Sequence, residues 1–167
     1  MAAYRAMEAR PAAKSRSILV KWMGITDANS AGFVHGGTVM KLCDEAAGLA
    51  AVRHSRSRVV TAAVDRMTFL HPVFVGELMT LTARVNAVWR TSMEVGVRVE
   101  AENPRTGDSR HTGTAYFTMV ALDEDGRPTG VPDVRIETED EERRAREAQV
   151  RRANRLAERD ELRAGRN

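Results

Sequence analysis

One acidic residue, Asp44, stands in a run of the sequence where a charge is costly. The run extends without proline from the glycine pair Gly36–Gly37 to about Arg53, and apolar side chains occupy nearly every face of the helix that it predicts. It is too short to span a bilayer with its other charged residues inside it, so we expect a helix in the middle of a domain. A carboxylate there must be paired, open to a cavity or do chemistry, which makes Asp44 a candidate for catalysis.

The start of this helix is a second place suited to chemistry. Gly36, Gly37 and Thr38 are expected to form its first turn, where backbone N–H groups lack partners and the helix dipole favours negative charge. Glycine also lets another molecule come close to the backbone. The first turn is therefore a candidate site for a negatively charged group.

The elements that must position these residues follow from the periodicity of the chain. Residues 17–23 predict a strand, and a loop rich in Gly, Asp, Asn and Ser leads from it into the helix. After the helix, the alternation of apolar and polar residues predicts four long strands, at about 58–69, 79–89, 93–101 and 110–122. Short turns make consecutive strands antiparallel, and the helix is the apolar element available to cover one face of the sheet. We expect an α+β fold in which a five-stranded antiparallel sheet wraps a long central helix.

Different compositions mark the two ends of the chain. Residues 1–15 show no clear period and are expected to be a poorly ordered lead-in to a domain at 16–133. Residues 134–167 are expected to hold a charged C-terminal helix capped by Thr138, because nine acidic and nine basic residues follow from 137 onward. Val150 and Leu156 offer this helix only a thin apolar stripe for docking, so the pattern favours a solvated helix lying on the domain.

The composition excludes several function classes. The formal charge of +3 in 167 residues is not gathered in a basic run with interleaved aromatic residues, so we expect no nucleic-acid partner. The single cysteine, Cys43, is interpreted as a small buried hydrophobic residue, and one cysteine fits a reducing compartment. No secretory signal or membrane span is visible, so a cytoplasmic protein without membrane association is expected. Metal binding has little support, because the four histidines are scattered: His35, His54, His71 and His111.

Several stretches together resemble the hotdog-fold acyl-CoA thioesterases. Within that family the sequence is most similar to the cytosolic brain-type acyl-CoA hydrolases and their single-domain bacterial relatives. The matching stretches are DANSAGFVHGGT at 27–38, KLCDEAAG at 41–48, VTAAVD at 60–65, FLHPV at 69–73 and TSMEV at 91–95, with the charged tail from Glu137. His-Gly-Gly alone would not be specific, but the set covers the chain from Ser17 to its end.

The resemblance implies a hotdog thioesterase domain at 16–133 whose strands lie in the order 1-3-4-5-2 around the helix. It also implies that the second strand, about 58–69, pairs with its copy in a partner chain, with the active site at that interface. Asn29 of one chain would face Asp44 of the other, because this sequence holds both residues in one domain. The family often assembles further, so we expect at least a homodimer and, beyond it, a trimer of dimers.

The activity that the resemblance implies is hydrolysis of fatty acyl-CoA to free fatty acid and coenzyme A. No cofactor is expected, since coenzyme A is part of the substrate and product. Asp44 would act as general base on a water or, as the alternative, as a direct nucleophile. Asn29 would hold the water or the carbonyl, and the N–H groups of Gly36 and Gly37 would stabilise the oxyanion.

Other residues are expected to contact the substrate. By resemblance His35 shapes the loop before the helix, and the backbone of Val60, Thr61 and Ala62 pairs with pantetheine amides. The hairpin residues Arg90, Thr91 and Ser92 are either an ordinary turn or contact coenzyme A, where Arg90 can pair with a phosphate.

Two other functions stay open as alternatives. The loop at 71–76 is similar to the proline-glycine loop of hotdog hydroxyacyl-thioester dehydratases, but that chemistry needs a His base beside an acid on the helix. A non-catalytic acyl-CoA-binding protein of the same fold would usually carry a DNA-binding domain, which is not visible in this sequence.

Overall fold

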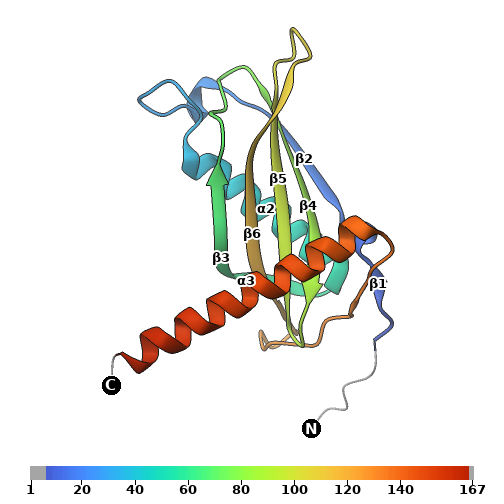
Figure 1. Cartoon of the computed structure of the whole chain (residues 1–167). Coiled ribbons are helices and arrows are strands. Elements are labelled where there is room, and N and C mark those ends of the chain that lie inside the picture. The colour runs from blue at the N-terminus through green and yellow to red at the C-terminus, as the bar shows by residue number, and fades with distance from the viewer. Residues whose placement is uncertain (1–6, 166–167) are drawn as a thin grey trace.

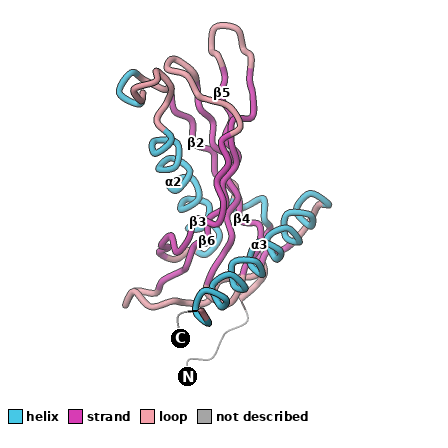
Figure 2. Tube along the Cα trace, turned by 60° about the vertical axis from the view of Figure 1, so that its left-hand side comes forward, coloured by secondary structure: helices cyan, strands magenta, loops and turns pink. Residues whose placement is uncertain are grey.

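The protein is built in three layers, and its computed structural model describes residues 7–165. Helix α2 (Gly36–Ser55) lies on one face of a five-stranded antiparallel sheet, and helix α3 (Glu139–Ala164) lies on the other (Figure 1, Figure 2). The strands are β2 (Ser17–Trp22), β3 (Arg58–Phe69), β4 (Leu78–Val88), β5 (Ser92–Glu102) and β6 (Ser109–Leu122). Their order across the sheet is β2-β4-β5-β6-β3, which confirms the predicted 1-3-4-5-2 order. Among the described residues, no helix is both long enough and apolar enough to cross a membrane.

The hydrophobic core lies between α2 and the sheet. Alternate residues of the strands point at the helix, and Leu81, Val95 and Phe117 among them are fully buried. The side chains that α2 turns toward the sheet are small: Cys43, Ala46, Ala47, Ala50 and Ala51. Small side chains let the helix lie close to the strands. The apolar residues that alternate along the strands and the alanines of the helix therefore form one core.

The opposite side of α2 is open within one chain. Met40, Leu49 and Val52 are exposed, although the sequence predicts a helix in the middle of a domain, with apolar residues on nearly every face. That expectation is wrong for the single chain, because the sheet covers α2 from one side only. Apolar residues on the uncovered side are typical of a surface that meets another molecule.

The segment before β2 is ordered from residue 10 onward. Strand β1 (Arg10–Pro11) pairs in parallel with β7 (Val134–Arg135), and a short helix α1 (Ala12–Ser15) follows. The Ser15 hydroxyl is buried, donates to the Ala12 carbonyl (2.7 Å) and accepts from the Val85 N–H (3.0 Å). The expectation of a poorly ordered lead-in is therefore wrong for residues 10–15. Hydrogen bonds hold this segment in place, and they leave no periodic apolar pattern in the sequence. Residues 1–6 of that prediction lie outside the described part of the chain.

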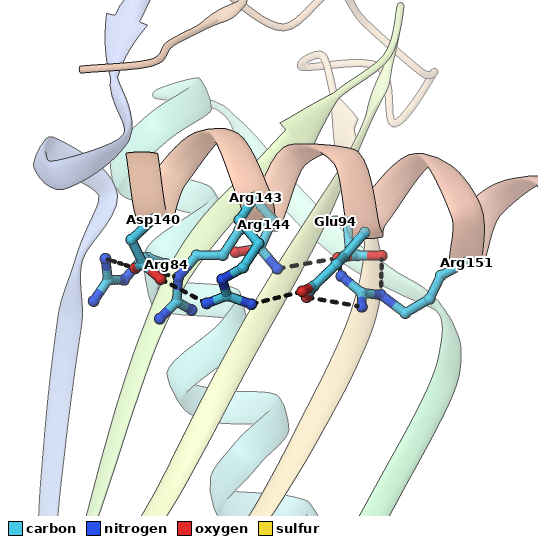
Figure 3. A network of polar contacts seen from close by, with 8 residues as sticks. Arg84, Glu94, Asp140, Arg143, Arg144 and Arg151 are labelled. Carbon is cyan, nitrogen blue, oxygen red and sulfur yellow. Dashed lines mark hydrogen bonds and ion pairs between the residues drawn. The ribbon is translucent and has the colours of Figure 1, made fainter. Parts of the chain in front are cut away.

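Helix α3 docks on the sheet through charged side chains and not through an apolar stripe. Its predicted cap is present, since the Thr138 hydroxyl accepts a hydrogen bond from the Glu141 N–H (3.2 Å). The predicted stripe is wrong, because Val150 is 60% exposed and Leu156 only half-buried. The helix instead crosses the outer face of the sheet diagonally, with ion pairs to its strands along the way (Figure 1, Figure 3).

The most buried of these contacts is an ion pair between α3 and β5. The Arg151 guanidinium donates to both carboxylate oxygens of Glu94, at 2.7 and 3.0 Å (Figure 3). The Asn86 amide donates a third bond to Glu94, at 3.0 Å. Arg151 also stacks on the Tyr116 ring, 3.7 Å from its centre. Burial alone would lower the pKa of Arg151, but the bonds and charge of Glu94 outweigh it and raise that pKa.

Gly96 makes room for this arrangement. A Cβ at that position would lie 2.7 Å from Nδ2 of Asn86, which is closer than real Cβ atoms come to a neighbour. The glycine therefore allows Asn86 to reach Glu94 beneath α3.

Candidate active site

The loop between β2 and α2 is fixed by Asp27, which ends the short helix η1 (Ile25–Asp27). Its carboxylate accepts from the Lys21 ammonium (2.5 Å) and from the Gly24 N–H (2.9 Å), and its carbonyl accepts from the His35 N–H (2.7 Å). The hydrogen bond from Lys21, followed by that from Gly24, holds the pKa of Asp27 below its usual value. Asp27 thus stays charged near neutral pH and ties both ends of the loop together.

Asn29 sits inside this loop, at the wall of a cavity. Its Oδ1 accepts from the N–H groups of Ala31 (2.9 Å) and Phe33 (3.2 Å), so the carbonyl half of the side chain shapes the loop. Within residues 7–165, no hydrogen bond is formed by its Nδ2 group. Asn29 lines a cavity of about 300 Å³ together with Phe33, Val34, Gly36, Val39 and Phe69, among other residues. Asn29 can therefore donate a hydrogen bond to a molecule in a mostly apolar cavity.

The first turn of α2 differs from the prediction in one respect. His35 caps the helix, and its Nδ1 accepts from the Gly37 N–H at 2.9 Å. The Gly37 N–H expected to stabilise an oxyanion is already engaged, whereas the Gly36 N–H has no protein partner in the described part of the chain. Gly36 also lines the cavity, so it is the donor that the helix start offers to a ligand.

Asp44 is half-buried on α2 and is held by a residue of the edge strand. The Thr61 hydroxyl of β3 donates to its Oδ1 at 2.5 Å and also lies 3.4 Å from the Met119 sulfur. The register between β3 and β6 shifts between Thr61 and Ala63, so Ala62 bulges out next to this contact. The sequence predicted a backbone role for Thr61 and missed its hydroxyl, because no local pattern joins residues 17 positions apart.

The neighbours of Asp44 have structural roles. Glu45 is exposed and pairs with Lys41 one turn earlier (2.7 Å), which agrees with its structural interpretation. Cys43 is fully buried, and burial, helped by the charge of Asp44, raises the pKa of its thiol to about 12. A thiol with that pKa is a poor nucleophile and metal ligand near neutral pH, so Cys43 serves in the core as predicted.

One chain does not bring the predicted site residues together. Asp44 follows Gly36 by eight helical residues, a rise of about 12 Å, and it does not line the cavity that holds Asn29. Thr91 lies at the opposite end of the sheet from this cavity, because its carbonyl accepts from Ala121 (3.0 Å), whereas the cavity lies where Phe69 pairs with Gly113. Arg90 is exposed in the same hairpin. A site that includes all of these residues needs a second chain.

Strand β3 is the exposed edge at which a second chain can pair. Val60, Thr61, Ala62 and Val64 are all exposed along it. A long edge strand of β-branched residues presents unpaired backbone groups that favour pairing with another strand. The expected position of the dimer interface is therefore open in the single chain.

Proteins similar to this chain in sequence and fold include acyl-CoA thioester hydrolases. Residues 31–107 match the Thioesterase superfamily. The rat cytosolic acyl coenzyme A thioester hydrolase is 39% identical over 140 residues, which cover 82% of this chain and 36% of that protein. A solved hexameric acyl-CoA thioesterase is 39% identical with a TM-score of 0.88, over 91% of this chain and 97% of the other. The chain belongs to the hotdog-fold acyl-CoA thioesterases. This confirms the family and the α+β hotdog fold expected from the sequence.

A third related protein shows which ligands a hotdog-fold acyl-CoA thioesterase can hold. The acyl-CoA hydrolase of Staphylococcus aureus, solved with butyryl coenzyme A and coenzyme A, is 30% identical with a TM-score of 0.86, over 93% of this chain and 95% of the other. Variants of that hydrolase, in which an aspartate, an asparagine or a threonine is replaced by alanine, have also been solved. The present thioesterase chain spans about a third of the length of the rat relative.

Proposed function

We propose that this protein hydrolyses fatty acyl-CoA to free fatty acid and coenzyme A, at sites built by two chains. The observation that carries the proposal is Asp44, oriented by Thr61 at the free β3 edge and remote from Asn29 in its own chain. The S. aureus hydrolase supports it, because the residue types replaced by alanine there are those of Asp44, Asn29 and Thr61. We place this activity in the cytoplasm, as the name of the rat relative indicates for that enzyme.

In the proposed assembly, β3 of one chain pairs with β3 of a second chain around a twofold axis. This pairing satisfies the edge strand and carries the Asn29 loop of one chain to Asp44 of the other, so each dimer has two equal sites. The exposed Met40, Leu49 and Val52 of α2 would meet the partner at the same interface. The hexameric relative supports three such dimers in one assembly.

The proposed chemistry uses Asp44 as general base. A water adds to the thioester carbonyl carbon while its proton passes to the Asp44 carboxylate, which Thr61 keeps in orientation. The oxyanion that forms is stabilised by the Gly36 N–H and the Asn29 amide. The carbon–sulfur bond then breaks, and the coenzyme A thiolate leaves with the proton from Asp44.

The activity is tested directly by free-thiol release from acyl-CoA esters, from acetyl to palmitoyl coenzyme A. We expect saturable thiol release that is lost in the Asp44→Ala variant. Binding of acyl-CoA without thiol release would instead indicate a non-catalytic binding protein. Hydration of an enoyl thioester without thiol release would indicate a dehydratase.

Arg90 provides a prediction about the coenzyme A part of the substrate. If its exposed guanidinium pairs with a phosphate, Arg90→Ala is expected to raise KM more than it lowers kcat, because that contact is equal in ground and transition states. The rise in KM should shrink at high salt, where exposed charges are screened. The measurement is steady-state kinetics at two ionic strengths, and Arg56→Ala, a second exposed arginine outside the hairpin, is the control. An unchanged KM in Arg90→Ala would contradict a contact with coenzyme A and indicate that the hairpin is an ordinary turn.

A further inference from the structure

The C-terminal end of α3 extends past the edge of its own sheet. The helix contacts β4 through Asp140 and Arg84 (3.7 Å), then β5 through Arg151, and finally Asp65 of the edge strand β3 through Arg155. Beyond Arg155, the helix makes no hydrogen bond or ion pair with another element of the described chain. Figure 1 shows this end, residues 156–164, projecting beyond β3.

The face of α3 that packs on the sheet continues into this projecting end. Glu141 and Ala148 are buried against the sheet, and Arg155 follows seven residues later with its contact to Asp65. Seven residues fall only about 20° short of two full turns, so the next member of the series, Leu162, lies on the same face. Leu162 is 58% exposed, and no strand within residues 7–165 of its own chain lies beneath it. A large apolar side chain thus stands on the packing face with nothing to pack against.

We propose that residues 156–164 of α3 dock on the outer sheet face of a second copy of this chain, so that the two helices clasp the dimer. The inference rests on the proposed β3–β3 dimer, which puts the partner's sheet directly beneath the projecting end. Nine helical residues span about 13 Å, and strands lie about 4.8 Å apart, so the diagonal helix end reaches over at most about two to three partner strands. Twofold symmetry makes the contact reciprocal, with each α3 lying over the other sheet.

Charges at the sheet edge fit this docking. The projecting end carries Glu158, Asp160 and Glu161 against Arg159 and Arg163, and is therefore slightly acidic. Exposed Arg66 of β3 forms no ion pair within the described residues.

A groove of about 230 Å³ lies between β3 and α3, and Arg66 and Glu158 both line it. A second copy would bring an acidic helix end for Arg66 at this groove.

The first test replaces Leu162 by aspartate and measures the dimer dissociation constant by sedimentation in a dilution series. Leu162→Asp is expected to raise that constant at least about tenfold, because it puts a charge in place of a buried leucine in both copies. Val150→Asp is the matched control, since Val150 is equally exposed on the same helix but lies before the sheet edge. Equal dissociation constants for Leu162→Asp and the wild type would contradict the clasp.

The second test locates the contact by photo-crosslinking. A benzophenone amino acid is placed at position 162, or at position 150 as the control, in mixed ¹⁴N- and ¹⁵N-labelled chains. The clasp predicts mixed-isotope crosslinks from position 162 to β3, β6 or α3 of the other copy, and none to these elements from position 150. A full-sized dimer without such crosslinks would overturn the clasp alone. A monomer would overturn the clasp together with the proposed dimeric site.

Discussion

Replacing Asp44 by alanine is expected to lower kcat for acyl-CoA hydrolysis by about 10²- to 10⁴-fold, the usual effect of removing a general base. The Thr61 hydroxyl donates to the Asp44 carboxylate at 2.5 Å, and the neighbouring Cys43 thiol, with a pKa of about 12, cannot take over the role of base. Asp44→Asn is expected to be nearly as inactive, because an amide of the same shape cannot accept a proton. Single-turnover thiol release, with the enzyme in saturating excess over the substrate, measures this step.

Glu45→Gln is the matched control for this prediction. Glu45 is the next residue on α2, is exposed and pairs only with Lys41 in the described chain, so its replacement should leave kcat unchanged. Near-wild-type activity in Asp44→Asn would contradict a role for Asp44 in proton transfer. An equal loss in Glu45→Gln would indicate damage to the helix and not to catalysis.

Replacing Glu94 by alanine is expected to destabilise the fold by about 3–5 kcal/mol, the cost of breaking a buried ion pair from one side. Glu94 is 1% exposed, and its loss leaves the Arg151 guanidinium beneath α3 without its bidentate partner. The Asn86 amide loses its acceptor at the same time. Replacing both members of the pair, as in Glu94→Met with Arg151→Met, should recover most of the loss, because no charge is then left buried.

The measurement is urea unfolding followed by far-ultraviolet circular dichroism at one fixed protein concentration. Glu147→Ala is the control, since Glu147 also pairs with arginines of α3 but its side chain is 41% exposed, and pairs in contact with solvent contribute about 0–1 kcal/mol. A Glu94→Ala variant as stable as Glu147→Ala would show that α3 is not anchored by this pair.

The sequence predicted the core of the fold because apolar periodicity encodes it. The alternation of apolar and polar residues identifies the strands, and Leu81, Val95 and Phe117 are among its apolar members that are buried. The proline-free apolar run identifies α2. The strand order could not be derived from periodicity and came from the family resemblance. Met40 and Leu49 on α2 are exposed and show the limit of such patterns. A sequence pattern shows that a residue is apolar, but it does not show whether the same chain or a partner chain covers that residue.

Polar contacts between distant residues are what the sequence could not predict. The docking of α3 uses Arg151 and Arg155, which look like solvated charges in the sequence because their carboxylate partners lie on strands 57 and 90 positions away. The Thr61–Asp44 bond is hidden for the same reason. The cap formed by His35 with the Gly37 N–H depends on one side-chain rotamer, which residue type and spacing do not determine.

The two-chain site is tested most directly by mixing inactive variants. Asp44→Ala and Asn29→Ala chains are purified separately, each with greatly reduced activity, and are then allowed to exchange subunits in equal amounts. Random exchange makes half of the dimers mixed, and each mixed dimer has one intact site out of two, so the mixture should recover about a quarter of the wild-type rate. If exchange is demonstrated by mass spectrometry and the mixture stays as inactive as its components, Asp44 and Asn29 do not act together across two chains.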